Sequence, residues 1–498
     1  MSKDKVSTLK SPLIPYEFAK TQRVIAIEEN DVLCVFSEQP LDRHLFEELS
    51  RFLAVGFESK TCSLVDFDNL LTEHYSVNDE NSIGNTDISS DFDLQSFANT
   101  IAPTEDLLSG ANDAPIIKLI NGVISEAIKN RASDIHFEPY EDNFIIRYRV
   151  DGILEQVLAH DSRLSAPIIS RLKIIARLDI AERRRPQDGR VSLSLGAKKI
   201  DVRVSTLPSS YGERVVLRLL DKQSAQINVV DLGFPNLILE TYKGALQFSE
   251  GIILVTGPTG SGKTTTLYSG LREVSDTSQN ILTVEDPIEY TLPGIGQTQV
   301  NAKAGYDFAS GLRSILRQDP DIVMVGEIRD LETAKIAIQA SLTGHLVLST
   351  VHTNSAIGAI TRLRDMGIES YLLASSIRVV MSQRLVRRLC PNCKKPLDPP
   401  VAVKQKYALK SNDQTYQSIG CIECNQTGFK GRIALAECIS ISDDLKALIH
   451  DEASEAQLND CAFKNNLSID SSSAQLLKDG VTSYEELLRF QNNQDANL

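Results

Sequence analysis

The sequence predicts an α/β protein whose second half is a mainly parallel sheet with helices on both faces. Four short stretches in that half, 252–256, 280–284, 322–325 and 346–350, are mostly apolar. Runs of this length indicate strands that are buried on both faces. Helical patterns separate them, which is the alternation typical of parallel α/β sheets. In contrast, residues 114–225 combine helices with several strands in succession, which predicts a preceding α+β domain.

Composition divides the 498 residues into four expected parts. Residues 1–75 are predicted to form a small mixed N-terminal domain. Residues 76–113 are rich in Asn, Asp, Ser and Thr and poor in large apolar residues, which predicts a flexible acidic linker. The α+β middle domain covers 114–225. The main α/β domain covers 234–498 and includes a cysteine-bearing insert at 390–432 and a helical C-terminal tail.

Charge and hydropathy exclude some classes of function. The formal net charge is −14, so bulk attraction to nucleic acid is not expected, and we predict no nucleic-acid partner. No stretch approaches the roughly 18–20 apolar residues that a membrane span requires. The first ten residues mix Lys, Asp and Ser and lack the apolar core of a secretory signal. We therefore expect a cytoplasmic protein that reaches a membrane only through a protein partner.

A phosphate-binding loop follows the first apolar strand of the main domain. It fits the pattern G-x-x-x-x-G-K-[ST], and a helical stretch follows it, which is the required context. The glycines let backbone N–H groups close around phosphates, and the helix N-terminus favours negative charge. Lys263 is expected to reach the β- and γ-phosphates, and the Thr264 hydroxyl is expected to bind Mg²⁺. The predicted ATP-binding residues are Gly257, Pro258, Thr259, Gly260, Ser261, Gly262, Lys263 and Thr264.

Three further groups of residues lie at the ends of predicted strands. Glu327 follows the strand 322–325 and is predicted to act as a general base or to orient water, with a turn-capping carboxylate as the alternative. Glu285 and Asp286 follow another strand and are predicted to hold Mg²⁺ or its waters, against a solvated loop. His345 and His352 flank the strand 346–350. They are candidates for sensing the γ-phosphate, and a structural hydrogen-bonding role is the even alternative.

Eight cysteines occur in the sequence, and four of them form two C-x-x-C pairs. In a chain expected to be cytoplasmic, this arrangement indicates a metal rather than disulfides. Four thiolates form a tetrahedral sulfur set that favours Zn²⁺, over iron–sulfur or redox alternatives. The predicted structural zinc ligands are Cys390, Cys393, Cys421 and Cys424.

The middle domain contains two informative patterns. Asp151-Gly152 lies between two strand-like runs and predicts a hairpin turn. In residues 214–220, alternation places Arg214, Val216 and Arg218 on one face of a strand. An arginine on such a strand needs an anionic partner. That partner is a phosphate at a domain or subunit interface, or the carboxylate of an intradomain salt bridge.

These motifs together resemble the secretion ATPase superfamily. After the phosphate-binding loop, TVEDPIEY, DIVMVGEIRD and GHLVLSTVHTN occur in the order and spacing of its Asp box, Walker B and His box. RASDIHFEP and RRRPQDGR upstream and the four cysteines narrow the resemblance to the assembly ATPases of bacterial type II secretion. It covers residue 114 to the C-terminus and is weaker before residue 90.

The resemblance implies a RecA-like P-loop domain, a PAS-like middle domain, and ATP, Mg²⁺ and Zn²⁺ as cofactors. It also implies a homo-hexamer that drives pseudopilus assembly. The implied partners are the cytosolic domain of a bitopic L-type inner-membrane protein, which the N-terminal domain would dock, and a polytopic F-type platform protein. The chain would then lie on the cytoplasmic face of the inner membrane. By motif, Glu327 is the catalytic carboxylate, His345 and His352 are box histidines, and the arginines near the phosphates are Arg203, Arg218, Arg313, Arg317 and Arg329.

Three other functions share parts of this pattern. Pilus-extension ATPases of type IV or competence pili have every core motif, including the cysteines, although the short first domain favours type II secretion. A DNA-translocating P-loop protein is suggested by the run Arg183-Arg184-Arg185, but a short arginine run is usually a solvated surface. A nucleotide-binding docking protein without hydrolysis is the third alternative.

Overall fold

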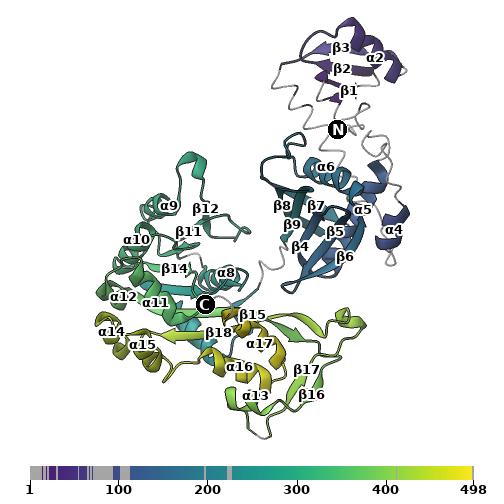
Figure 1. Ribbon diagram of the computed structural model, residues 1–498. Coiled ribbons are helices and arrows are strands. Elements are labelled where there is room, and N and C mark those ends of the chain that lie inside the picture. The colour runs from purple at the N-terminus through teal and green to yellow at the C-terminus, as the bar shows by residue number, and fades with distance from the viewer. Residues whose placement is uncertain are drawn as a thin grey trace, which may run out of the picture. The chain divides into compact units, whose positions relative to one another are not determined.

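The structure is a computed structural model that describes residues 14, 18–19, 22–29, 32–53, 55–63, 67, 70, 94–100, 113–195, 198–220, 227–276, 278–410 and 412–495. Two compact units divide the chain, Met1–Leu220 and Asp221–Leu498 (Figure 1). Each unit is described by itself. None of the described helices is long and apolar enough to cross a membrane.

A small three-stranded sheet begins the first unit. Strand β1 pairs antiparallel with β2, and β2 pairs parallel with β3. One helix, α2, follows β2, and its Leu49 is buried in the same apolar cluster as Val24 and Val35. The elements are β1(Val24–Glu29), β2(Val32–Ser37), α2(Arg43–Leu53) and β3(Glu58–Thr61).

A six-stranded antiparallel sheet forms the rest of the first unit, in the order β6-β5-β4-β9-β8-β7. Helices α5 and α6 share one apolar cluster with one face of this sheet. The predicted hairpin is present: Asp151 and Gly152 both adopt positive φ between β5 and β6. The elements are α5(Asp113–Lys129), β4(Ala132–Pro139), β5(Asn143–Val150), β6(Ile153–Asp161), α6(Ser165–Ile175), β7(Gln187–Leu195), β8(Lys198–Ser209) and β9(Gly212–Leu220).

One part of the expected linker is a helix. Residues 94–100 form α4(Leu94–Thr100), whose Leu94 and Ala98 are buried in the cluster that also contains Ile116 of α5. The spacing Leu94, Phe97 and Ala98 is an amphipathic helical pattern, although the segment is short and surrounded by polar residues. The prediction of a flexible linker is therefore wrong for these residues. The remainder of 76–112 lies outside the described residues.

A seven-stranded sheet is the centre of the second unit, in the order β12-β11-β13-β14-β10-β15-β18. All neighbouring strands pair in parallel except β15 and β18, which are antiparallel. The strands are β10(Gly251–Thr256), β11(Ile281–Glu285), β12(Gly296–Gln299), β13(Ile322–Val325), β14(Leu346–Val351), β15(Ile377–Leu389) and β18(Phe429–Ser440). The helices of this part are α7(Asn236–Ala245), α8(Lys263–Val274), α9(Phe308–Ile315), α10(Leu331–Leu342), α11(Ala356–Asp365) and α12(Ser370–Ser376).

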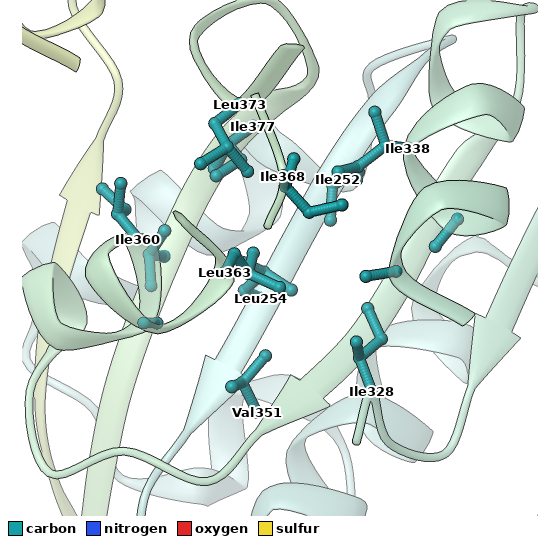
Figure 2. Close-up of a cluster of buried hydrophobic side chains, with 14 of the residues drawn as sticks. Ile252, Leu254, Ile328, Ile338, Val351, Ile360, Leu363, Ile368, Leu373 and Ile377 are labelled. Carbon is teal, nitrogen blue, oxygen red and sulfur yellow. The ribbon is translucent and has the colours of Figure 1, made fainter. Parts of the chain in front are cut away.

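The central strands are buried on both faces, as the apolar runs predict. Ile252 and Leu254 of β10 belong to a cluster that includes Ile338 of α10 and Leu363 of α11 (Figure 2). The alternate residues of β10 pack into a second cluster with residues of α7 and α8. Burying both faces fixes the strand register, because a slip of one residue would exchange the two sets of side chains.

The last two strands are long and were not distinguished by the sequence. Strand β15 leads directly to Cys390, and β18 begins shortly after Cys424, so the cysteine insert joins their ends. Figure 1 shows this insert at the end of the second unit that is remote from β11 and β12. The remaining elements are β16(Lys395–Leu397), α13(Val401–Lys406), β17(Thr415–Gln417), α14(Asp443–His450), α15(Glu455–Ala462), α16(Ile469–Lys478) and α17(Tyr484–Asp495).

A buried ion pair stabilises the first unit and leads to a testable prediction. Lys173 Nζ lies 2.8 and 2.9 Å from the two carboxylate oxygens of Glu213, and the two side chains are 1% and 5% exposed. Replacing Lys173 with Met leaves the Glu213 charge buried and unpaired. We expect the free energy of unfolding of this unit to fall by about 3–5 kcal/mol, measured by urea denaturation of the full chain.

The control for this experiment is an exposed pair of similar length. Arg163 Nη2 lies 2.9 Å from Asp161 Oδ2, with side chains 65% and 37% exposed. Arg163→Met should leave the unfolding midpoint unchanged, because solvent screens the pair. The double variant Lys173→Met/Glu213→Leu should recover much of the lost stability, since no buried charge remains. Equal stability of Lys173→Met and the wild type would contradict the assigned role.

Candidate nucleotide-binding site

The phosphate-binding loop connects the carboxyl end of β10 to the amino end of α8. Gly257 has φ +141° and Gly262, which caps α8, has φ +87°, a region that side chains with a Cβ rarely adopt. A Cβ at Gly257 would also lie 2.3 Å from the carbonyl oxygen of Gln383. Both backbone conformation and the closeness of β15 therefore require glycine at the start of the loop.

Lys263 is buried at the first position of α8. Its ammonium donates hydrogen bonds to the carbonyl oxygens of Gly257 at 2.9 Å and Pro258 at 3.0 Å. Burial lowers the pKa of Lys263, and the negative charge of Glu327 partly opposes that change. The ammonium thus lies inside the loop and interacts electrostatically with Glu327. Neutral carbonyls are weak partners for a buried ammonium, so an anion in the loop would be favoured.

The residues of the loop fit a bound phosphate group. The Ser261 hydroxyl is buried and has no hydrogen-bond partner within the described part of the chain. The amino end of α8 offers backbone N–H groups and the positive end of the helix dipole. Thr264 occupies the second position of the same helix, next to Lys263. This donor set suits a triphosphate with Mg²⁺.

Glu327 lies at the same edge of the sheet, just after β13. Its carboxylate contacts two basic side chains: His352 Nε2 at 3.1 Å and Arg329 Nη2 at 2.5 Å. The hydrogen bond from the N–H of Ile328 to the carbonyl of Thr350, at 2.9 Å, joins this turn to the end of β14. The two strands therefore present Glu327 and His352 to each other. The hydrogen bond to Glu327 raises the pKa of Arg329, and Asp286 contributes to the increase through its charge.

Asp286 is exposed at the end of β11 and lies within electrostatic range of Arg329. Lys263, Glu327, Arg329, His352 and Asp286 thus gather at the carboxyl edge of the parallel strands. This is the edge at which ligands bind in open α/β sheets.

Glu285 has a different environment from the one expected. Its side chain is 3% exposed and accepts hydrogen bonds from Tyr268 of α8, from Thr283 at 2.5 Å and from Gln297 at 3.0 Å. A carboxylate with three protein donors inside the core is not available to Mg²⁺. The structure therefore corrects the predicted metal-binding role of Glu285: it connects β11, β12 and the phosphate-loop helix.

His345 lies at the opposite edge of the sheet. It precedes β14, and its backbone carbonyl accepts a hydrogen bond from Gly251 at the start of β10. Its ring Nδ1 lies 2.9 Å from the carbonyl of Ala340. Six residues of parallel strand separate this edge from the phosphate-binding loop, about 20 Å. The prediction that His345 senses the γ-phosphate is therefore wrong within one chain, because a histidine at the amino end of a parallel strand faces away from the site.

The middle-domain arginines are paired within the first unit. Arg203 and Arg218 face each other across β8 and β9. Arg218 Nε donates to Asp134 Oδ1 at 3.0 Å, and Arg203 Nη2 lies 3.5 Å from Asp188 Oδ1. Both side chains remain partly exposed, at 55% and 38%. The opposite face of β9 is buried, as the alternation predicts.

The other arginines occupy separate places in the second unit. Arg313 of α9 forms an ion pair with Glu332. Arg317 donates to the carbonyl of Arg313 at 2.9 Å. Of these three arginines, Arg329 is the one that contacts Glu327.

The four predicted zinc ligands converge at one point. Their Sγ atoms all lie within 4.8 Å of one another, and three of the separations are 3.7, 3.8 and 3.8 Å. A tetrahedral ZnS₄ site with Zn–S bonds of about 2.3 Å has S···S separations of about 3.8 Å. Backbone N–H groups of Cys421 and Gly428 point at Cys424 Sγ, both at 3.2 Å. The donor set therefore fits a structural metal without an open position.

Sequence reasoning missed two residues that support the site. Gln383 of β15 hydrogen-bonds to Ser261 and Thr266 on either side of Lys263. Glu437 of β18 accepts a hydrogen bond from the N–H of Ala356 at 2.7 Å, at the start of α11. Burial raises the pKa of Glu437. A polar side chain inside an otherwise apolar strand was the available signal in both cases.

Comparison with known proteins gives a consistent result. Residues 109–489 match the family described as Type II/IV secretion system protein, and residues 13–75 match an N-terminal domain family of GSPII protein E. The chain is 47% identical to the Type II secretion system ATPase E of Vibrio cholerae, over 96% of each chain. It is 48% identical to the Type II secretion system protein E of Pseudomonas aeruginosa, over 96% of this chain and 95% of the relative.

Solved structures show the same fold. The ATPase DotB of Legionella pneumophila is 20% identical and superimposes with a TM-score of 0.56, covering 76% of this chain and 96% of DotB. The pilus retraction motor PilT with bound ADP is 25% identical, with a TM-score of 0.52, covering 73% of this chain and 94% of PilT. The chain belongs to the Type II/IV secretion system protein family and, within it, to the type II secretion ATPases.

Proposed function

We propose that this chain hydrolyses ATP as the motor of a type II secretion system, energising pseudopilus assembly and protein export across the outer membrane. One observation carries the enzymatic part: Glu327, held by His352 and Arg329, lies at the same sheet edge as the loop that contains Lys263. The secretion role rests on the type II relatives, which align over almost the whole chain.

The phosphate-binding loop would hold ATP through backbone N–H groups and Lys263. In the structure Lys263 donates to two loop carbonyls, and a triphosphate would replace them as a stronger, charged partner. The Thr264 hydroxyl would bind Mg²⁺, which supplies charge neutralisation between the β- and γ-phosphates. Asp286, exposed at the same edge, is the remaining carboxylate for the metal's waters.

Glu327 would act as the general base, or orient the attacking water. Its carboxylate sits between His352 and Arg329, and these contacts fix the direction of its two oxygens. His352 is 48% exposed, so it can move with the occupancy of the site. The geometry thus favours the catalytic role of Glu327 over the turn-capping alternative.

Arg203 and Arg218 would complete the site from another domain or subunit of a hexamer. Their partners in the first unit are carboxylates, and each side chain is still partly exposed. A phosphate would be a stronger partner for two adjacent arginines than one carboxylate each. The isolated chain should therefore have low basal turnover.

We assign the four-cysteine cluster to structural Zn²⁺. We place the protein on the cytoplasmic face of the inner membrane through its N-terminal domain, which matches a domain family of type II protein E. The partners would be the cytosolic domain of the bitopic L-type protein and the polytopic F-type platform protein. The pilus-extension, docking-protein and DNA-translocating alternatives are not favoured, because the relatives aligned over nearly the full length are type II secretion proteins.

The catalytic assignment predicts a separation of binding from turnover. Glu327→Gln keeps the shape of the side chain but removes the base, so steady-state ATP hydrolysis should fall by about 10²–10⁴-fold while Mg-ATP still binds in calorimetry. Lys263→Ala should lose binding itself. Glu369→Gln, a carboxylate at the start of α12, serves as the matched control and should behave as wild type. Full turnover by Glu327→Gln would refute the assignment.

The metal assignment predicts about one zinc per chain. Mass spectrometry of the purified protein for metals should show this ratio, and Cys421→Ser should abolish it. Cys461→Ser removes an isolated, partly buried cysteine and should retain the zinc. Iron in place of zinc, or a full complement in Cys421→Ser, would contradict a ZnS₄ site.

The partner assignment predicts binding to the L-type cytosolic domain of the same secretion system. The full chain should co-elute with that domain in size-exclusion chromatography, and the complex should hydrolyse ATP faster than the chain alone. The equivalent domain of a type IV pilus assembly complex is the control and should not co-elute. Binding to the pilus domain instead would transfer the chain to pilus extension.

A further inference from the structure

A buried glutamine on β15 connects the last parallel strand to the phosphate-binding loop. Gln383 is 1% exposed. Its Nε2 donates to the carbonyl oxygen of Ser261 at 2.7 Å, and its Oε1 accepts from the hydroxyl of Thr266 at 2.8 Å. One amide therefore contacts the loop two residues before Lys263 and the helix three residues after it.

The chemistry of its partners fixes the orientation of this amide. A backbone carbonyl can only accept hydrogen bonds, so the NH₂ group of Gln383 must face Ser261. Its oxygen then faces Thr266, whose hydroxyl can donate. Both ends of the amide are satisfied inside the protein. In this arrangement Gln383 is a bridge within the site and needs no solvent or ligand partner.

Strand β15 also presses against the glycines of the loop. A Cβ at Gly257 would lie 2.3 Å from the carbonyl oxygen of Gln383, and a Cβ at Gly262 would lie 3.1 Å from its Nε2. The adjacent Ser382 hydroxyl donates to the carbonyl of Asn354 at 3.3 Å, in the loop that follows His352. Neighbouring residues of β15 thus contact both loops of the site.

We propose that Gln383 is a positioning residue that sets the direction of one peptide group in the phosphate-binding loop. The carbonyl of Ser261 and the N–H of Gly262 belong to one planar trans peptide, so they point in opposite directions. By holding the carbonyl against β15, Gln383 turns the Gly262 N–H toward the space enclosed by the loop. Without that bond, the glycine peptide can rotate and turn a carbonyl oxygen toward the phosphates. This inference rests on the proposed nucleotide-binding function.

The test measures Mg-ATP affinity by calorimetry in the full chain. Gln383→Met keeps the length of the side chain but cannot form either hydrogen bond. Loss of one N–H donor to a charged phosphate should weaken binding by about ten-fold or more. Gln383→Glu keeps the acceptor for Thr266 but replaces the donor to Ser261, so it should weaken binding at least as much.

The control separates positioning from stability. Thr482→Val removes a buried hydrogen bond, 2.9 Å long, to the carbonyl of Arg387 on the same strand, away from the loop. It should lower the melting temperature without changing Mg-ATP affinity. If wild type binds Mg-ATP and either folded Gln383 variant binds it equally well, the inference is overturned while the proposed function stands. If wild type itself does not bind, the proposed function fails instead.

Discussion

The parallel pairing of β10 with β14 on one side and β15 on the other is the constraint on which the site depends. Parallel strands in register end at the same edge of a sheet. The phosphate-binding loop after β10, Glu327 after β13 and His352 after β14 therefore meet, although they are far apart in the sequence. Burial of these strands on both faces prevents slippage, because a shifted strand would exchange its two apolar faces.

The charges at this edge are balanced in a way that suits a transient anion. Glu327 is nearly buried and is compensated by His352 and Arg329, so its carboxylate stays ordered. Lys263 is buried against neutral carbonyls, and its desolvation is compensated only in part by Glu327. A phosphate group entering the loop would satisfy Lys263 without competing for the partners of Glu327. The two key charges thus remain separate in function.

The C-terminal strand pair gives this site a second layer of support. Gln383 on β15 contacts the phosphate-binding loop, and Glu437 on β18 contacts the start of α11 after the His352 loop. The same two strands end at the cysteine cluster, and Arg387 of β15 pairs with Glu486 of the C-terminal tail at 2.7 Å. A rigid antiparallel ribbon therefore connects the metal-binding insert, the tail and both loops of the nucleotide site.

The sequence by itself determined the elements whose chemistry is local. The phosphate-binding loop, the cysteine pairs, the apolar strands and the Asp151-Gly152 hairpin are recognisable because a few adjacent residues impose their conformation or ligand set. Tertiary structure decided the rest. Glu285 and Asp286 are neighbours, yet one is enclosed by donors from α8 and β12 and the other is exposed. His345 and His352 flank the same strand, but parallel pairing sends them to opposite edges. Gln383 had no motif, because its function arises from residues more than a hundred positions away. Contacts between distant segments depend on strand order and register, which no local pattern specifies.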